Sequence, residues 1–261
     1  MLNSLSPIYP ALSRKSWLSK GAKLELIKLF SFYGETVLDP FCGVGNTGIA
    51  AKETGRGFIG QDSNPEYIAI AERELSEIPA VNTTARYQLR NGDSRDLSFL
   101  SDNSVSLIVT SPPYWNKADY GDYDANIGAL DIYGDFLCAM ETVMQECYRV
   151  LEPGRRFCIV TANVNQHTKD GLLTFPIAGD LISRAQSLGF LLVNEIIWSK
   201  DGTGGKWGSA GKQRPIFGSY PYPPNFLFKN VHEYIIILKK PNEAKKSNKA
   251  PDYQDLLGDS Y

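Results

Sequence analysis

The chain has 261 residues, of which 43% are hydrophobic and 21% are charged, and these ordinary globular values exclude global disorder. The 27 basic residues nearly balance the 29 acidic ones, which excludes a histone-like polycation but not a local basic face that binds nucleic acid. The sequence lacks an apolar run long enough for a membrane span or a secretion signal, and its four cysteines lack C-x-x-C spacing. These features predict a reduced, cytoplasmic protein without a metal site.

The order of the predicted elements alternates between strands and helices. Apolar residues at Leu24, Ile27, Leu29 and Phe30 predict a first helix within residues 22–33. Later helices are expected from Asn46, from the N-cap Asn64 to about Leu75, over 131–151 and near 176–187. Short apolar segments predict strands at 36–39, 57–62, 87–89, 105–110, 157–161, 191–198 and 234–238.

This alternation is typical of an α/β fold with a mainly parallel sheet and helices on both faces. The last two predicted strands are joined by about thirty residues without a helix pattern, so they are expected to pair as an antiparallel hairpin. We predict a single domain over residues 1–240 and a flexible, polar tail over residues 241–261.

A glycine-rich turn follows the first predicted strand, in the segment Asp39-Pro40-Phe41-Cys42-Gly43-Val44-Gly45-Asn46-Thr47. Glycines at a strand-to-helix turn let a ligand approach the backbone and the free N–H groups of the helix start. Asp62 ends the second strand, where a carboxylate can accept both hydroxyls of a ribose, and Asp93 follows the third strand. Because Gly48 completes a G-x-G-x-x-G pattern, the turn by itself leaves a dinucleotide ligand open.

A second turn, Ser111-Pro112-Pro113-Tyr114, directly follows the apolar strand at 105–110. The two prolines stiffen the turn and fix the directions of its carbonyls and of the Ser111 hydroxyl, while Tyr114 supplies a flat face. Hydrogen-bond acceptors beside a stacking surface suit a planar base that carries an amino group.

Together, D-P-F-x-G-x-G-x-T and S-P-P-Y resemble the S-adenosylmethionine-dependent DNA methyltransferases that modify exocyclic amines. The resemblance covers residues 8–240 and implies a Rossmann-like methyltransferase fold with a seven-stranded sheet whose last strand is antiparallel. Many relatives place S-P-P-Y before the glycine motif, so the order here resembles a circular permutation. Many also read G-S-G-T-T where this chain has Gly43 to Thr47, which leaves the role of Asn46 open.

The resemblance implies roles for the two turns and for the acids beside them. Ser111 and the Pro112 carbonyl would accept from the target amine, with Pro113 fixing the turn and Tyr114 stacking on a flipped base. Asp62 would bind the ribose of S-adenosylmethionine and Asp93 its adenine amine. The methionine end and adjacent backbone would lie against Asp39, Pro40, Phe41, Gly43, Gly45 and Thr47.

The atom that is modified follows from two further observations. No Pro-Cys pair is present to supply the nucleophile for cytosine carbon 5, and Cys42 is expected to be a packed small residue. Serine in the first position of S-P-P-Y resembles the N4-cytosine enzymes, so N4 of cytosine is expected and N6 of adenine is the alternative. Methylation of RNA or of a protein glutamine is a less favoured alternative, and a catalytically idle DNA-binding module is a different class.

Residues 200–229 carry five basic residues against one acid, Asp201, with six aromatic side chains. This segment is expected to grip double-stranded DNA through Lys206, Lys212 and Arg214, although an ordinary solvated loop would have a similar composition. The resemblance also suggests a cognate restriction endonuclease as a partner. A separate recognition domain is not expected, and short recognition sites or a homodimer that shares the duplex are hypotheses that would compensate for it.

Overall fold

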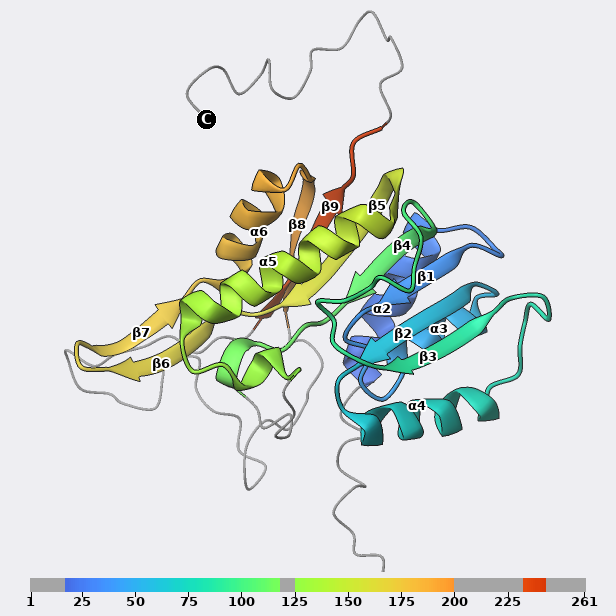
Figure 1. Ribbon diagram of the computed structural model, residues 1–261, viewed down its shortest axis with the longest axis horizontal. Helices are drawn as coiled ribbons and strands as arrows, with labels where there is room; N and C mark the ends of the chain where they lie inside the picture. The colour runs from blue at the N-terminus through green and yellow to red at the C-terminus, as the bar shows by residue number, and fades with distance from the viewer. Residues whose placement is uncertain (1–16, 118–124, 200–231, 243–261) are drawn as a thin grey trace, which may run out of the picture.

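The computed structural model of the protein describes residues 17–117, 125–199 and 232–242 (Figure 1). Its main sheet has seven strands in the order β3-β2-β1-β4-β5-β9-β8. Neighbouring strands from β3 to β5 are parallel, whereas β9 runs antiparallel to both β5 and β8. The predicted α/β fold, with its antiparallel last strand, is therefore confirmed.

The elements follow one another nearly as the sequence predicts. The helices are α2 (Trp17–Phe30), α3 (Asn46–Glu53), α4 (Pro65–Glu77), α5 (Tyr133–Val150) and α6 (Ile177–Ser187), with short 3-10 turns at Trp115–Lys117 and Ile127–Ala129. The strands are β1 (Thr36–Asp39), β2 (Gly57–Asp62), β3 (Tyr87–Asn91), β4 (Val105–Thr110), β5 (Leu151–Thr161), β6 (Val164–Thr168), β7 (Gly171–Phe175), β8 (Leu191–Ser199) and β9 (His232–Lys239).

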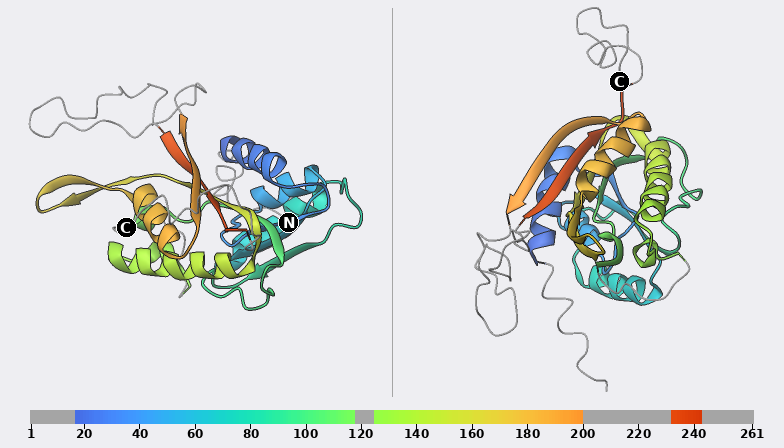
Figure 2. Two further views of the ribbon diagram at one scale, coloured as in Figure 1. Left: turned by 90° about the horizontal axis from the view of Figure 1, so that it is seen from above. Right: turned by 90° about the vertical axis from the view of Figure 1, so that its left-hand side faces the viewer.

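Helices cover both faces of the sheet, with α2, α3 and α4 on one face and α5 and α6 on the other (Figure 2). Alternate residues of the central strands feed two cores: Val37 packs with α3 and α4, and Leu38 packs with α5 and α6. The predicted apolar stripe of α5 is confirmed, because Phe136, Met140 and Val143 are buried. In α2 the expectation for Leu29 is wrong, since that side chain is 70% exposed while Leu26 and Ile27 face the core.

A two-stranded hairpin, β6-β7, was not predicted from the sequence. It pairs Val164 with Phe175 and extends beyond the body of the molecule (Figure 1). Phe175 packs at the base of the hairpin against Trp115, with 4.8 Å between ring centroids, and against Tyr133. The Gln166 amide donates to the side chain of Asn116, so the hairpin is held close to the turn that follows β4.

The turn from β1 into α3 depends on two glycines in the left-handed region of φ. Gly43 has φ +51° and Gly45, the N-cap of α3, has φ +87°. A Cβ atom at Gly45 would lie 2.9 Å from the Cβ of Ala71, whereas one at Gly43 would meet nothing within 4 Å.

We therefore expect Gly45→Ala to destabilise the protein more than Gly43→Ala. Both variants incur the left-handed strain of about 1–2 kcal/mol, and Gly45→Ala adds overpacking of about 1–3 kcal/mol against α4. Urea unfolding of the two variants and the wild type measures this difference. Equal losses of stability would contradict the close packing of the turn on α4.

Candidate functional site

Four loops meet at the carboxyl edge of the parallel strands, one after each of β1, β2, β3 and β4. Hydrogen bonds join them in series: the Cys42 N–H donates to the Gln61 carbonyl over 2.9 Å, and the Gly92 N–H to the Asp62 carbonyl over 3.0 Å. The Ser94 hydroxyl donates to the Pro40 carbonyl and ties the loop after β3 to the loop after β1. The structure thus brings the residues predicted for the glycine turn together with Asp62 and Asp93.

Asp39 lies at the centre of this edge, and its carboxylate is fully buried. One oxygen accepts from the Phe41 N–H at 3.1 Å and from the Thr110 hydroxyl at 2.6 Å. The other accepts from the Lys23 ammonium at 3.2 Å and from the Thr47 hydroxyl. Because a buried charge is costly unless it is paired and hydrogen-bonded, these four donors are what allow a carboxylate at this position.

Lys23 and Thr110 were not identified from the sequence as site residues. Lys23 is 6% exposed and reaches Asp39 from α2, while Thr110 is the last residue of β4 and directly precedes Ser111. Asp39 therefore connects the glycine turn after β1 with the Ser111 turn after β4. These two strands are adjacent, with Val37 opposite Leu107 and Leu38 opposite Ile108.

Asp62 holds the glycine turn in place through its side chain. One carboxylate oxygen accepts from the Gly43 N–H at 2.8 Å and the other from the Asn64 N–H at 3.0 Å. Asn64, not Asp62, caps α4, since its side chain accepts from the Glu66 and Tyr67 N–H groups, as predicted for this N-cap. Burial raises the pKa of Asp62 despite these two hydrogen bonds.

Asp93 is turned toward a neighbour in its own loop. Its carboxylate forms a two-pronged ion pair with Arg95, at 2.6 Å between the closest atoms. The Asp93 carbonyl accepts from the side-chain amide of Gln61, a buried residue of β2. Gln61 also donates to the Asp96 carbonyl at 3.1 Å, so it fixes the position of this loop beside Asp62.

The Ser111-Pro112-Pro113-Tyr114 turn lies next to β9. The Tyr114 hydroxyl donates to the Glu233 carboxylate at 3.1 Å and lies 3.4 Å from the Ser111 hydroxyl. Glu233, on β9, is only 7% exposed. No role for this glutamate was predicted from the sequence, although the segment Asn230-Val231-His232-Glu233 contributes to the family resemblance. The signal that could have found it is an acid next to the apolar residues of a buried strand.

The cysteines near this edge do not have the properties of nucleophiles. Cys42 packs in the core beneath the glycine turn, and burial raises the pKa of its thiol well above the usual value. This confirms the expectation that Cys42 is a packed small residue. Among the residues that the structure describes, no group of three or more His, Cys, Asp or Glu side chains is placed to hold a metal ion.

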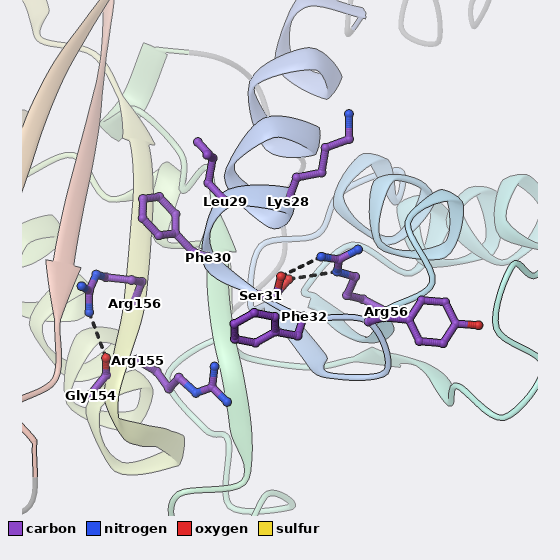
Figure 3. Close-up of a pocket in the computed structure, with 10 residues that line it drawn as sticks. Lys28, Leu29, Phe30, Ser31, Phe32, Arg56, Gly154, Arg155 and Arg156 are labelled. Atoms are coloured by element: carbon purple, nitrogen blue, oxygen red, sulfur yellow. Dashed lines mark hydrogen bonds between the residues drawn. The ribbon is translucent and has the colours of Figure 1, made fainter.

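A cavity of about 410 Å³ lies away from this site (Figure 3). Its lining comes from the end of α2 and from the first half of β5, with Arg56 at one side and Arg155 and Arg156 at the other. None of the residues predicted for catalysis or cofactor binding lines it. The cavity lies at the amino ends of the parallel strands, so it is separate from the glycine turn and the Ser111 turn at their carboxyl ends.

Some predicted features lie outside the described residues. They include the proposed DNA contacts Lys206, Lys212 and Arg214, the basic segment 200–229 as a whole, and residues 243–261 of the polar tail. Within the described parts of the chain, no helix is both long enough and apolar enough to cross a membrane.

The family model of the N6/N4 DNA methylases matches residues 23–73 and 105–256, which is more than half of the chain. The protein therefore belongs to this family of amino-methyltransferases, which confirms the resemblance found in the two turns. The matched regions include Lys23, Asp39, Ser111 and Glu233, the residues that the structure connects at the carboxyl edge.

Two curated relatives are type II methyltransferases of archaea. M.MjaI of Methanocaldococcus jannaschii is 26% identical over 194 residues, covering 66% of this chain and 61% of that protein. M.MthZI of Methanothermobacter thermautotrophicus is 27% identical, covering 69% of this chain and 51% of that protein. The chain thus spans less than two thirds of the length of either relative.

Among solved structures, a SAM-dependent methyltransferase from Methanosarcina mazei has a TM-score of 0.53 at 14% identity, covering 84% of this chain and 98% of that one. This likeness shows a shared fold.

The role of Asp39 leads to a prediction with a matched control. Thr110→Val removes a hydrogen bond to a buried charge and should cost about 1.5–3 kcal/mol of stability. Thr161, at the end of the neighbouring strand β5, is equally buried, and its hydroxyl finds no partner among the described residues. Thr161→Val should therefore be neutral or stabilising in the same thermal unfolding experiment, and a similar loss in both variants would argue against a special role for Thr110.

Proposed function

We propose that this protein transfers a methyl group from S-adenosylmethionine to the exocyclic N4 of a cytosine in duplex DNA. The observation that carries the proposal is the connection through Asp39, which holds the glycine turn and the Ser111 turn against each other at adjacent strand ends. A methyl donor and an acceptor base must lie side by side for direct transfer, and this edge offers one surface for each.

The residues after β1 and β2 fit the cofactor. The backbone at Gly43 is open, because no atom lies within 4 Å of the position where a Cβ would stand, so a ligand can approach it closely. Asp62 lies beside that position and keeps carboxylate lone pairs that ribose hydroxyls can donate to. When bound, S-adenosylmethionine supplies a methyl group on a sulfonium sulfur. As the methyl is transferred, this sulfur departs as a neutral thioether and needs no further activation.

Asp39 contributes indirectly in this proposal. Its carboxylate accepts hydrogen bonds from four protein groups, so its role is to fix the positions of Phe41, Thr47 and Thr110. Asp93 is expected near the adenine amine, with Arg95 orienting its carboxylate. Pro40 and Gly45 complete the turn through their backbone.

The Ser111 turn serves the base. Ser111 and the Pro112 carbonyl accept hydrogens of the target amine, which favours the pyramidal nitrogen whose lone pair attacks the methyl carbon. Pro113 keeps the turn rigid and the ring of Tyr114 stacks on the base after it has left the duplex. The nitrogen then releases one proton to water, so that the neutral methylated amine is the product.

Duplex binding is proposed to use Lys206, Lys212 and Arg214 to neutralise phosphates. Since the relatives M.MjaI and M.MthZI are type II methyltransferases, a cognate endonuclease that cuts the same recognition sequence is a proposed partner. A homodimer that shares one duplex is a further proposal.

Mapping modified bases in the DNA of a host that expresses the protein tests the proposed reaction. We expect N4-methylcytosine at one short recognition sequence, and none in a host that expresses Ser111→Ala. N6-methyladenine at such a sequence would support the same site residues and show that the target base is adenine. The absence of both marks from purified duplex DNA incubated with S-adenosylmethionine would contradict the proposal.

The Asp62 role predicts how cofactor affinity depends on pH. Ribose hydroxyls donate more strongly to the ionised carboxylate than to the protonated one. Affinity should therefore fall as the pH falls through the raised pKa of Asp62, and binding there should release a proton. Asp62→Asn should raise Kd roughly ten- to a hundredfold and remove this dependence. Calorimetry in two buffers of different ionisation enthalpy measures both effects, and a variant that binds as the wild type does would refute the role.

A further inference from the structure

The Tyr114 hydroxyl lies between the hydroxyl of Ser111 and the carboxylate of Glu233. The Tyr114 oxygen is 3.1 Å from Glu233 Oε1 and 3.4 Å from Ser111 Oγ. Tyr114 and Ser111 belong to the turn after β4, whereas Glu233 comes from β9, which pairs with β5 rather than with β4. Two segments more than a hundred residues apart in the sequence thus complete one short chain of hydrogen bonds.

The chemistry of these three groups determines which one donates in each hydrogen bond. An ionised carboxylate is only an acceptor, and a phenol has a single hydrogen to donate. Tyr114 donates that hydrogen to Glu233, so toward Ser111 it can offer only a lone pair. In the contact between Ser111 and Tyr114, the serine must therefore be the donor.

This direction determines what Ser111 presents to a base. A serine hydroxyl has one hydrogen and two lone pairs. Because Ser111 donates its hydrogen to Tyr114, it has only lone pairs left for a base and can accept a hydrogen bond from an N–H group. An amino group of cytosine or adenine satisfies these lone pairs, whereas the carbonyl that replaces it in uracil or hypoxanthine would meet them with lone pairs of its own.

We propose that Glu233 is a specificity-determining positioning residue, which acts through Tyr114 to make Ser111 select an amino base over its keto counterpart. This inference rests on the proposed function and adds to it the reason why one base is rejected. A site whose polar groups are fixed in one direction discriminates strongly, because a wrong partner leaves buried groups unpaired.

The place of Glu233 in β9 supports this role. The residues that follow it on the same face, Ile235 and Ile237, are buried, and Glu233 itself is 7% exposed. Burying a carboxylate in such surroundings carries a desolvation penalty, and an apolar residue at this position would avoid it. An acceptor that never donates is the property that a carboxylate brings to the Tyr114 hydroxyl and that an apolar side chain lacks.

The test compares the binding of two duplexes that differ only at the target position. One carries the base that is methylated and the other its deaminated counterpart, uracil for cytosine or hypoxanthine for adenine. Competition binding in the presence of S-adenosylhomocysteine gives a preference ratio for each protein variant. A mispair leaves the helix more easily than a matched pair, but that effect is the same for all variants and cancels when their ratios are compared.

We expect Glu233→Gln to lower the preference for the amino base about tenfold. The glutamine amide can donate to the Tyr114 hydroxyl, so Tyr114 is free to donate to Ser111 and Ser111 to donate to the base. Tyr114→Phe keeps the ring for stacking and should lower the ratio by a similar factor. Because both changes break the same chain, the double variant should lose no more than either single one. The affinity for S-adenosylmethionine should stay unchanged in all three.

Glu195→Gln is the matched control, since Glu195 is an exposed glutamate on the neighbouring strand β8 and should leave the ratio as it is. A purely structural role for Glu233 would lower Tm in Glu233→Gln with no change in the ratio, and this result would overturn the inference. If Glu233→Gln fails to fold, an unaltered ratio in Tyr114→Phe would overturn it equally. A wild-type protein that methylates no amino base would instead contradict the proposed function.

Discussion

The buried carboxylate of Asp39 is the constraint on which the arrangement of the site depends. It accepts from residues of α2, of the glycine turn, of α3 and of β4, namely Lys23, Phe41, Thr47 and Thr110. The strand order reverses between β1 and β4, so the loops after these two strands lead to helices on opposite faces of the sheet and leave a crevice at the strand ends. A single fully desolvated charge with four donors fixes the spacing of these loops strongly, because losing any donor leaves the charge undercompensated.

Most of the fold could be predicted from the sequence, because strands 36–39 and 105–110 are short apolar runs between turn residues and α5 has a clear helical stripe. The hairpin β6-β7 could not, since Asn165, Gln166 and His167 are polar and β7 is exposed over most of its length. Its strands are held by pairing with each other and by Phe175 against Trp115, a contact between distant residues that periodicity does not reveal.

The site could be predicted in part, and the reason is again local chemistry. Prolines and glycines in short motifs mark the two turns, and Asp62 follows from its spacing to Gly43, which it contacts. Lys23 resembles the solvated lysines that most amphipathic helices carry, and Thr110 reads as one more β-branched residue of its strand. Glu233 belongs to Asn230-Val231-His232-Glu233, a segment that contributes to the family resemblance without giving the glutamate a role, and its approach to Tyr114 in three dimensions supplies that role.

The central claim is that cofactor and base meet at the edge held by Asp39, and a crystal structure with sinefungin tests it most directly. Sinefungin has a carbon that bears an amine where S-adenosylmethionine has a sulfonium that bears the methyl group, so its amine occupies the place of the methyl. The account predicts that its ribose lies on Asp62, its backbone contacts fall at Gly43, and its amine points toward Ser111 and Pro112. Binding at the opposite end of the sheet, in the cavity between Arg56 and Arg156, would contradict the account.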